Sequence, residues 1–321
     1  MKLVTLAGGA GGAAPDAGTP GALIDGEVVD FACAKALFPE TAALPGSLRG
    51  ILTAGAAALT LARRVVDRVA AAQGDARDDL RSVGIVKPLG ETKLLAPIPD
   101  PGIIISAGQT YRGHVLEMAA KRGIENPELP KTPRGFLKNP NALIGPEAPI
   151  RLPRAYPDHV DFEGEFAVVI GRSCHDVTPN EARACIAGYT LVNDVSARDW
   201  ASGKGTSDQT LLGKQFPTFC PLGPAVVTVD EIDDPHALTL TTTLNGAVMQ
   251  SEGNDDLIFS LWEIVAHYAR FYLLRPGDII TSGTPGGTGH GRDPKVYLKP
   301  GDRVEITVGG IGTLGNPVVG P

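Results

Sequence analysis

A chain of 321 residues is long enough to bury a sizeable hydrophobic core, and this length suggests about two domains. Hydrophobic residues make up 43% of the chain and charged residues 20%, which is the balance of a globular protein rather than a disordered one. The formal net charge of −7, together with the lack of any run of Lys and Arg, argues against nucleic acid as a partner.

The sequence predicts neither a secreted protein nor a membrane protein. Residues 1–18 are too interrupted by Gly and Pro for a signal peptide, and the most apolar stretch, residues 50–72, carries three Arg and one Asp. The four Cys form no Cys-x-x-Cys pair and have no His at zinc-finger spacing, so we expect idle thiols in a reducing compartment. We therefore expect a cytoplasmic protein.

The first hundred residues predict a small α+β unit. Residues 1–6 have the composition of a strand, and residues 21–31 predict a hairpin with Asp-Gly at its turn. Residues 51–72 have the apolar period of one amphipathic helix, and residues 82–96 are extended in character. A proline cluster at residues 97–101 then stiffens the chain and excludes a helix. We divide the chain there into a small N-terminal domain, residues 1–98, and a larger domain, residues 99–321.

The larger domain is predicted to be rich in β-strands. Residues 103–107 predict a short strand, residues 114–122 a helix, and residues 125–134 a Pro-rich, lid-like loop. From about residue 161 onward, short segments rich in β-branched residues are bounded by Gly or Pro. Helices are predicted at residues 179–187 and 256–273. The predicted fold class is therefore α+β and β-rich, a mixed β-roll or sandwich with a few helices packed outside.

Two glutamates separated by one residue lie at the start of a predicted strand. In Asp-Phe-Glu-Gly-Glu-Phe, the side chains of Glu163 and Glu165 point to the same face, because strand side chains alternate. Three aliphatic residues, 168–170, follow, so the strand enters a core where two like charges repel and lose hydration. A dication would relieve both effects. The alternative is an exposed edge strand with both carboxylates in water.

Asp194 adds a third carboxylate at the end of a second apolar strand, residues 189–192. Carboxylate oxygens without a nearby His or Cys suit a hard ion, so we expect Mg²⁺, with Mn²⁺ or Ca²⁺ as alternatives. Three carboxylates also leave coordination positions open for water or substrate. The sequence thus predicts a catalytic cation site.

Several motifs occur in an order that resembles the fumarylacetoacetate hydrolase family, especially its short bacterial members. After Glu-x-Glu come Asn-Asp-Val-Ser-Ala-Arg-Asp, Gly-Lys-Gln-Phe, Thr-Ser-Gly-Thr-Pro-Gly-Gly-Thr-Gly and Gly-Ile-Gly-Thr-Leu, so that the resemblance covers residues 106–319. It implies a homodimeric enzyme with the family's β-rich fold and a small 2-oxo acid as substrate. It also implies that Glu163, Glu165 and Asp194 hold the metal.

The same resemblance implies roles for two basic residues. Lys214 matches a site lysine, which can stabilise the charge of a developing enolate, whereas without the motif a solvated surface lysine is the simpler interpretation. Arg198 matches an arginine that can orient a distal carboxylate of the substrate. A structural ion pair of Arg198 with Asp199 or Glu181 is the alternative.

A segment before the Pro-rich loop, Tyr-Arg-Gly-His-Val-Leu-Glu, resembles another family motif. His114 and Glu117 lie three residues apart, on one face of a helical turn, so Glu117 can fix the imidazole tautomer while His114 deprotonates a water molecule. The resemblance makes Tyr111 and Arg112 candidate substrate contacts.

The Gly-rich loop, residues 283–289, lacks the Lys-Ser/Thr of a phosphate-binding loop. The resemblance implies that Gly283 and Thr284 line the substrate site, and a plain tight turn is the alternative. Three departures from the family pattern put the substrate in doubt. Ala201 stands where many relatives carry Gln, Pro217 replaces an acidic residue that often follows the site lysine, and Ala107 stands near the place of an additional Asp ligand in the longest members.

Together with the resemblance, these residues imply a divalent-metal-dependent hydrolase that cleaves a carbon–carbon bond of an acylpyruvate or β-diketo acid. The cation polarises the 2-oxo group, a water activated by His114 attacks a second carbonyl, and an enolate leaves. Decarboxylation, isomerisation or dehydration of a 2-oxo acid at the same site is the first alternative and needs no water nucleophile. A non-catalytic binding protein that the cation merely stabilises is the second.

Overall fold

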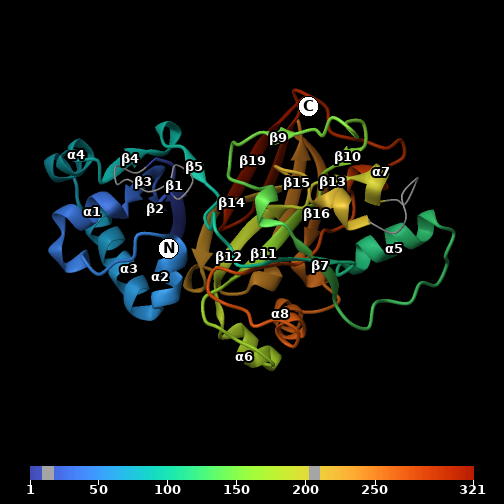
Figure 1. Ribbon diagram of the computed structural model, residues 1–321, viewed down its shortest axis with the longest axis horizontal. Coiled ribbons are helices and arrows are strands. Elements are labelled where there is room, and N and C mark those ends of the chain that lie inside the picture. Colours follow the sequence, from blue (N-terminus) through green and yellow to red (C-terminus); the bar gives the residue numbers. More distant parts are fainter. Residues whose placement is uncertain (9–17, 202–209) are drawn as a thin grey trace.

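The computed structural model describes residues 1–8, 18–201 and 210–321. A strand-rich body carries a smaller N-terminal lobe on one side (Figure 1). The predicted α+β, β-rich fold class is confirmed. The lobe contains β1 (Lys2–Leu6), β2 (Thr19–Ile24), β3 (Glu27–Asp30), α1 (Phe31–Leu37), α2 (Leu48–Ala54), α3 (Ala56–Ala71), α4 (Asp75–Ser82), β4 (Val86–Pro88) and β5 (Leu94–Leu95).

The body follows the proline cluster. Its first half contains β6 (Ile104–Gly108), α5 (Arg112–Lys121), β7 (Arg134–Lys138), β8 (Leu143–Ile144), β9 (Ile150–Arg151), β10 (Val160–Asp161), β11 (Gly164–Ile170), α6 (Pro179–Arg183), β12 (Ile186–Asn193), β13 (Ser196–Ala197) and α7 (Arg198–Ala201). Its second half contains the 3-10 helix η4 (Thr210–Lys214), β14 (Cys220–Thr228), β15 (Thr239–Leu244), β16 (Ala247–Gly253), α8 (Leu261–Ala269), β17 (Ile279–Thr281), β18 (Arg303–Val308) and β19 (Gly312–Val319).

One large sheet runs through both the lobe and the body. Its strands follow the order β4-β3-β2-β1-β14-β12-β11-β17-β6-β7, with β5 beside β1 and β8 beside β14. Strand β1 joins the lobe to the body, because Leu3 pairs with Val226 of β14. A second sheet has the order β16-β15-β18-β19-β9. The predicted domain boundary after residue 98 therefore separates two parts of one sheet, and the division into domains stays a prediction.

The central strand β11 is buried along its whole length, and its alternating side chains serve two different layers. Ala167 and Val169 belong to the hydrophobic cluster shared with the N-terminal lobe. Phe166 and Val168 belong to the cluster that includes α8 and the second sheet. Since side chains two residues apart share a face, Glu163 and Glu165 lie on the side of Ala167.

Two of the predicted helices differ in their bounds from the sequence pattern. The single helix predicted over residues 51–72 is wrong, because Gly55, with a φ of +71°, ends α2 and begins α3. Helix α8 starts late because Ser260 and Glu263 form a capping box at its N-terminus. Among the described residues, no helix is both long and apolar enough to cross a bilayer. A cytoplasmic location stays a prediction.

Candidate metal centre

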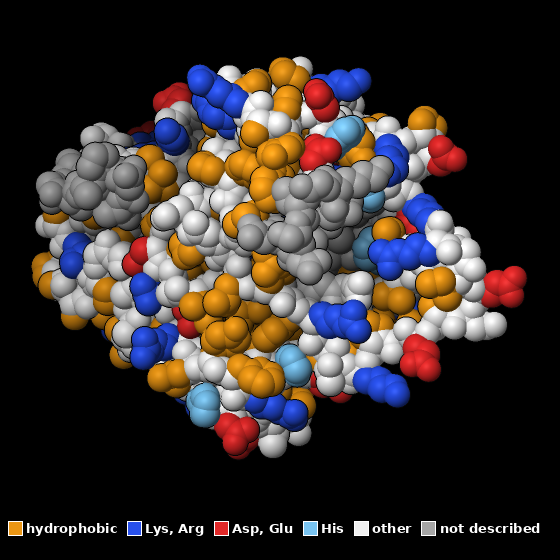
Figure 2. Space-filling view, turned by 45° about the vertical axis from the view of Figure 1, so that its right-hand side comes forward, with side chains coloured by type: hydrophobic (Ala, Val, Ile, Leu, Met, Phe, Trp, Pro, Cys, Tyr) orange, Lys and Arg blue, Asp and Glu red, His pale blue; other side chains and the backbone are white. Residues whose placement is uncertain are grey.

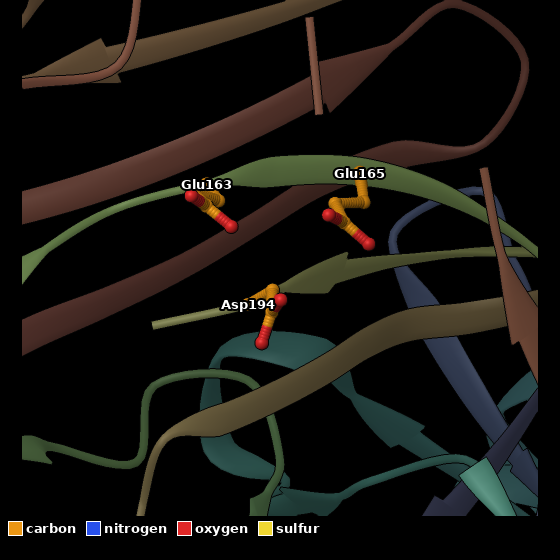
Figure 3. A group of neighbouring side chains, drawn as sticks. All are labelled: Glu163, Glu165 and Asp194. Atoms are coloured by element: carbon orange, nitrogen blue, oxygen red, sulfur yellow. The ribbon is translucent and has the colours of Figure 1, made fainter. Parts of the chain in front are cut away.

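Three acidic side chains come together where β11 begins and its antiparallel neighbour β12 ends (Figure 3). Strands β11 and β12 are antiparallel, with Gly164 opposite Asn193, and the Asp194 N–H donates to the Glu163 carbonyl at 2.9 Å. One carboxylate oxygen from each of Glu163, Glu165 and Asp194 lies within 4.8 Å of the other two. The predicted convergence of this acidic trio is confirmed.

Burial makes the trio a fit for a dication. Glu163 is 6% exposed, and Glu165 and Asp194 are each 1% exposed. The Glu165 Oε2 atom is buried and has no hydrogen-bond partner among the described residues. Burial and the charges of Asp194 and Glu163 raise the pKa of Glu165 well above its usual range. A hard divalent ion would satisfy the unpartnered oxygen and offset the repulsion, so the trio is a candidate site for Mg²⁺ or Mn²⁺.

Lys214 lies inside this centre. Its Nζ donates to Glu163 Oε2 and to Asp194 Oδ2, each at 2.6 Å, and lies 5.4 Å from the centre of the Phe136 ring. Burial alone would lower the pKa of Lys214, but the two carboxylates raise it above its usual value. The lysine is therefore a buried ammonium group, and the alternative of a solvated surface lysine is wrong.

Arg198 contacts the centre from the other side. Its guanidinium donates to Asp161 Oδ2 at 2.9 and 2.6 Å and to Glu163 Oε1 at 2.6 Å. The alternative ion pairs are wrong, because Asp199 contacts His159 at 2.7 Å and Glu181 caps α6. A role of Arg198 in orienting a substrate carboxylate stays a prediction.

Two residues of the centre escaped the sequence analysis. Lys138 is fully buried, and its Nζ contacts Asp194 Oδ1 and donates to the Lys214 carbonyl at 2.9 Å. Asp161 is fully buried and also accepts the N–H groups of Gly289 and His290 at 2.8 and 3.0 Å. Asp161 thereby ties Arg198 to the end of the Gly-rich loop. Its place two residues before Glu163, in a stretch whose sequence pattern suggests one continuous strand, was the available signal.

His114 and Glu117 lie together on α5, but their contact is loose. The Nδ1 atom of His114 lies 3.5 Å from Glu117 Oε2 and has no hydrogen-bond partner among the described residues. Glu117 accepts from Lys121 Nζ at 2.6 Å and from the Gly287 N–H at 3.2 Å. Contacts with His114, Lys121 and Gly287 lower the pKa of Glu117 to about 2 despite its partial burial. Glu117 is therefore ionised and holds α5 against the Gly-rich loop.

Two other side chains that were predicted to contact the substrate form hydrogen bonds within the protein instead. The Tyr111 hydroxyl is buried and donates to Asn254 Oδ1 at 2.6 Å, whereas Arg112 is exposed. The Thr284 hydroxyl donates to the Gly164 carbonyl at 2.9 Å. Gly283 has a φ of +83°, and a side chain there would clash with Thr110. Their roles as substrate contacts stay predictions. Ala107 is buried and offers no ligand oxygen, and the side chain of Ala201 lies outside the described part of the structure.

A pocket of about 550 Å³ lies between α5 and the Pro-rich loop. His114 lines it together with three basic residues, Arg122, Lys131 and Arg134, and one acidic residue, Glu128. On the side where α5 lies, Figure 2 shows Lys and Arg side chains gathered beside a hollow. An anionic group entering this α5 pocket would therefore meet mostly positive charge.

Comparisons with known proteins agree with this geometry. The family model "Fumarylacetoacetate (FAA) hydrolase C-terminal" matches residues 103–319. The mitochondrial oxaloacetate tautomerase fahd2 of Xenopus laevis is 38% identical over 276 residues, which cover 86% of this chain and 79% of that protein. The oxaloacetate tautomerase YisK of Bacillus subtilis is 35% identical over 300 residues, 93% of this chain and 95% of that protein.

A solved structure with a bound metal is also similar. It is the maleylpyruvate hydrolase of Sphingobium sp. SYK-6 in complex with manganese(II) ion and pyruvate. The TM-score is 0.69 at 26% sequence identity, and the match covers 100% of this chain and 99% of that one.

Proposed function

Since the chain belongs to the fumarylacetoacetate hydrolase family, whose members act on small oxo acids, we propose that it is a divalent-metal-dependent tautomerase of an oxaloacetate-like 2-oxo dicarboxylic acid. Two relatives with that printed activity match 86% and 93% of the chain. They support isomerisation, the alternative from the sequence, over the carbon–carbon bond hydrolysis that we expected first. The carrying observation is the buried trio with the unpartnered Glu165 oxygen, together with His114, which lines the pocket of mostly positive charge and helps to lower the pKa of Glu163.

Tautomerisation moves one proton from C3 of the acid to the 2-oxo oxygen. A bound dication would polarise the 2-oxo group and stabilise the enolate. His114 lines the pocket with its Nδ1 towards Glu117, which leaves Nε2 to take the C3 proton and to return it, directly or through water, to the 2-oxo oxygen. The ammonium of Lys214 donates hydrogen bonds beside the place where negative charge develops. The basic residues of the α5 pocket would hold the second carboxylate.

The loose contact between His114 and Glu117 also favours isomerisation. Hydrolysis needs a base that Glu117 orients tightly enough to deprotonate water. In this structure the Glu117 oxygens accept from Lys121 and Gly287, and the His114 contact is 3.5 Å long. Proton transfer from C3 needs a neutral imidazole but no activated water.

The test is to add purified protein and Mg²⁺ to the enol form of oxaloacetate and to follow the loss of enol absorbance. The protein should accelerate this loss, and the acceleration should disappear in excess chelator and in Glu163→Ala. Glu91→Ala, an exposed carboxylate of the N-terminal lobe, is the matched control and should behave like the wild type. An enol decay no faster than in buffer would refute the tautomerase proposal.

Hydrolysis of an acylpyruvate is the second candidate, and the similar maleylpyruvate hydrolase with manganese(II) and pyruvate favours it. Release of pyruvate from acylpyruvates, without effect on the enol of oxaloacetate, would select this candidate. His114→Gln should abolish hydrolysis, because no other side chain is proposed to activate water.

A further inference from the structure

One strand, β7, forms a wall that runs from the pocket to the metal centre. Side chains two residues apart on a strand share a face. Arg134 lines the α5 pocket, the Phe136 ring lies 5.4 Å from Lys214 Nζ, and Lys138 contacts Asp194. The two residues between them point the other way, since Leu137 is 46% exposed and a side chain on Gly135 would clash with Tyr268. The alternation of side chains along β7 thus places Lys138 against Asp194 in the metal centre.

Lys138 occupies one oxygen of a candidate metal ligand. Its side chain has no exposed surface, and its Nζ contacts Asp194 Oδ1 and donates to the Lys214 carbonyl at 2.9 Å. The other oxygen, Oδ2, accepts from Lys214 Nζ at 2.6 Å on the side of Glu163. Asp194 therefore presents Oδ2 to the trio, while Oδ1 is turned towards β7.

The position of this ammonium group opposes cation binding. A unit charge in contact with a ligand carboxylate repels an incoming dication, and the low dielectric of a buried site strengthens the repulsion. Lys138 is held there by two acceptors and by Gln215, which bonds to both neighbours of Lys138. Gln215 accepts the Asn139 N–H at 2.7 Å and donates to the Leu137 carbonyl at 3.1 Å. Because Lys138 is held firmly in a position that weakens cation binding, we look for a different role of its ammonium group at the centre.

We propose that Lys138 is a positioning residue that confines Asp194 to one ligating oxygen and so keeps coordination positions open for an oxo acid. The inference rests on the proposed function, in which the 2-oxo oxygen and the adjacent carboxylate of the acid would both need open positions on the cation. Mg²⁺ takes about six ligands, and a bidentate Asp194 would consume a position that the substrate needs. Lys138 thus lowers the affinity for the cation and raises the affinity of the loaded centre for its anion.

Lys138→Met tests this trade, because Met has a similar volume but no charge. The measurements are the Mn²⁺ affinity of the metal-free protein and the oxalate affinity of the Mn²⁺-loaded protein, both by calorimetry. The variant should bind Mn²⁺ about tenfold more tightly and oxalate about tenfold more weakly, changes of about 1.4 kcal/mol in opposite directions. Lys138→Arg, which keeps the positive charge, should bind both Mn²⁺ and oxalate with affinities close to those of the wild type. Lys299→Met removes the same charge at an exposed position and should change neither affinity.

Opposite shifts distinguish positioning from damage, because a merely misfolded centre would bind both ligands more weakly. Unchanged or weaker Mn²⁺ binding in the folded variant, or unchanged oxalate binding, would overturn the inference. If Lys138→Met does not fold, Lys138→Gln decides by the same two criteria, since its amide can keep one of the two hydrogen bonds. Wild-type protein that binds neither Mn²⁺ nor oxalate would refute the proposed function itself, which is a separate outcome.

Discussion

Glu165 couples the metal centre to pH. Its raised pKa means that the folded, metal-free protein holds a proton on this carboxyl more tightly than the unfolded chain does. That contribution to stability is present below the ordinary pKa of about 4.3 and is lost as the pH rises through the raised value. A bound dication replaces the proton, so the loss should not occur in the loaded protein.

We therefore expect the difference in melting temperature between Mg²⁺-loaded and chelator-treated protein to widen as the pH rises from the ordinary pKa of Glu, about 4.3, towards the raised pKa of Glu165. Thermal unfolding at several pH values in both conditions measures it. Glu165→Gln cannot titrate, and its chelator-treated form should melt above chelator-treated wild type at the higher pH. A constant difference across the range would show that Glu165 does not titrate within it and would contradict the prediction.

At this scale the sequence revealed the acidic residues better than the basic ones. Glu163, Glu165 and Asp194 could be predicted because carboxylates beside apolar strand residues are conspicuous and need a partner. Lys138 follows a Pro-rich loop in a strand with Leu137 exposed, where a lysine usually faces solvent. Its burial depends on β7 lying beside β6 and on η4 docking against its end, which are long-range contacts that no local pattern encodes.

Gln250 on β16 links the second sheet to the strand that carries the metal centre. Gln250 is 1% exposed, accepts the Gly164 N–H at 3.0 Å, and donates to Thr284 Oγ1 and the Pro285 carbonyl at 2.8 and 2.9 Å. It thus fastens β16 to both β11 and the Gly-rich loop. Each buried group left without a partner lowers stability by about 1–3 kcal/mol.

Gln250→Ala should therefore lower the free energy of unfolding by about 2–4 kcal/mol, measured by urea denaturation. Val248→Ala, on the same strand but with a side chain 60% exposed, is the control and should stay within about 0.5 kcal/mol of wild type. A loss below about 1 kcal/mol for Gln250→Ala would mean that water replaces the three bonds.

Elements were predicted well where the local pattern dominates and poorly where a single backbone position decides. The first strand and the Asp-Gly hairpin appear as predicted, in β1 and in β2–β3. Residues 51–72 keep a helical period across Gly55, and only its positive φ, which the chain adopts to turn α3 against the lobe, breaks the helix. The shorter α8 likewise reflects the cap at Ser260 rather than its apolar pattern.

For the whole molecule, we expect the shared sheet to make the lobe and the body unfold together as one unit. Removing the lobe would leave β14 without its neighbour β1 and expose an apolar strand edge. We expect a single cooperative transition in calorimetry of the full chain, with equal calorimetric and van't Hoff enthalpies. A fragment of residues 99–321 should be insoluble or molten. Two resolved transitions, or a stable fragment, would instead support the independent domains predicted from the proline cluster.

The pairing of β11 with β12 has a further consequence for how a finished molecule can be recognised. Gly164 lies opposite Asn193, and a slip of one residue would turn Glu163 and Glu165 towards the apolar layer of α8. A molecule with that error could not bring the three carboxylates together, so only correctly paired molecules would bind the ion. In a refolding mixture, the number of tightly bound ions per chain would therefore measure the fraction of molecules in which β11 and β12 pair in the native register.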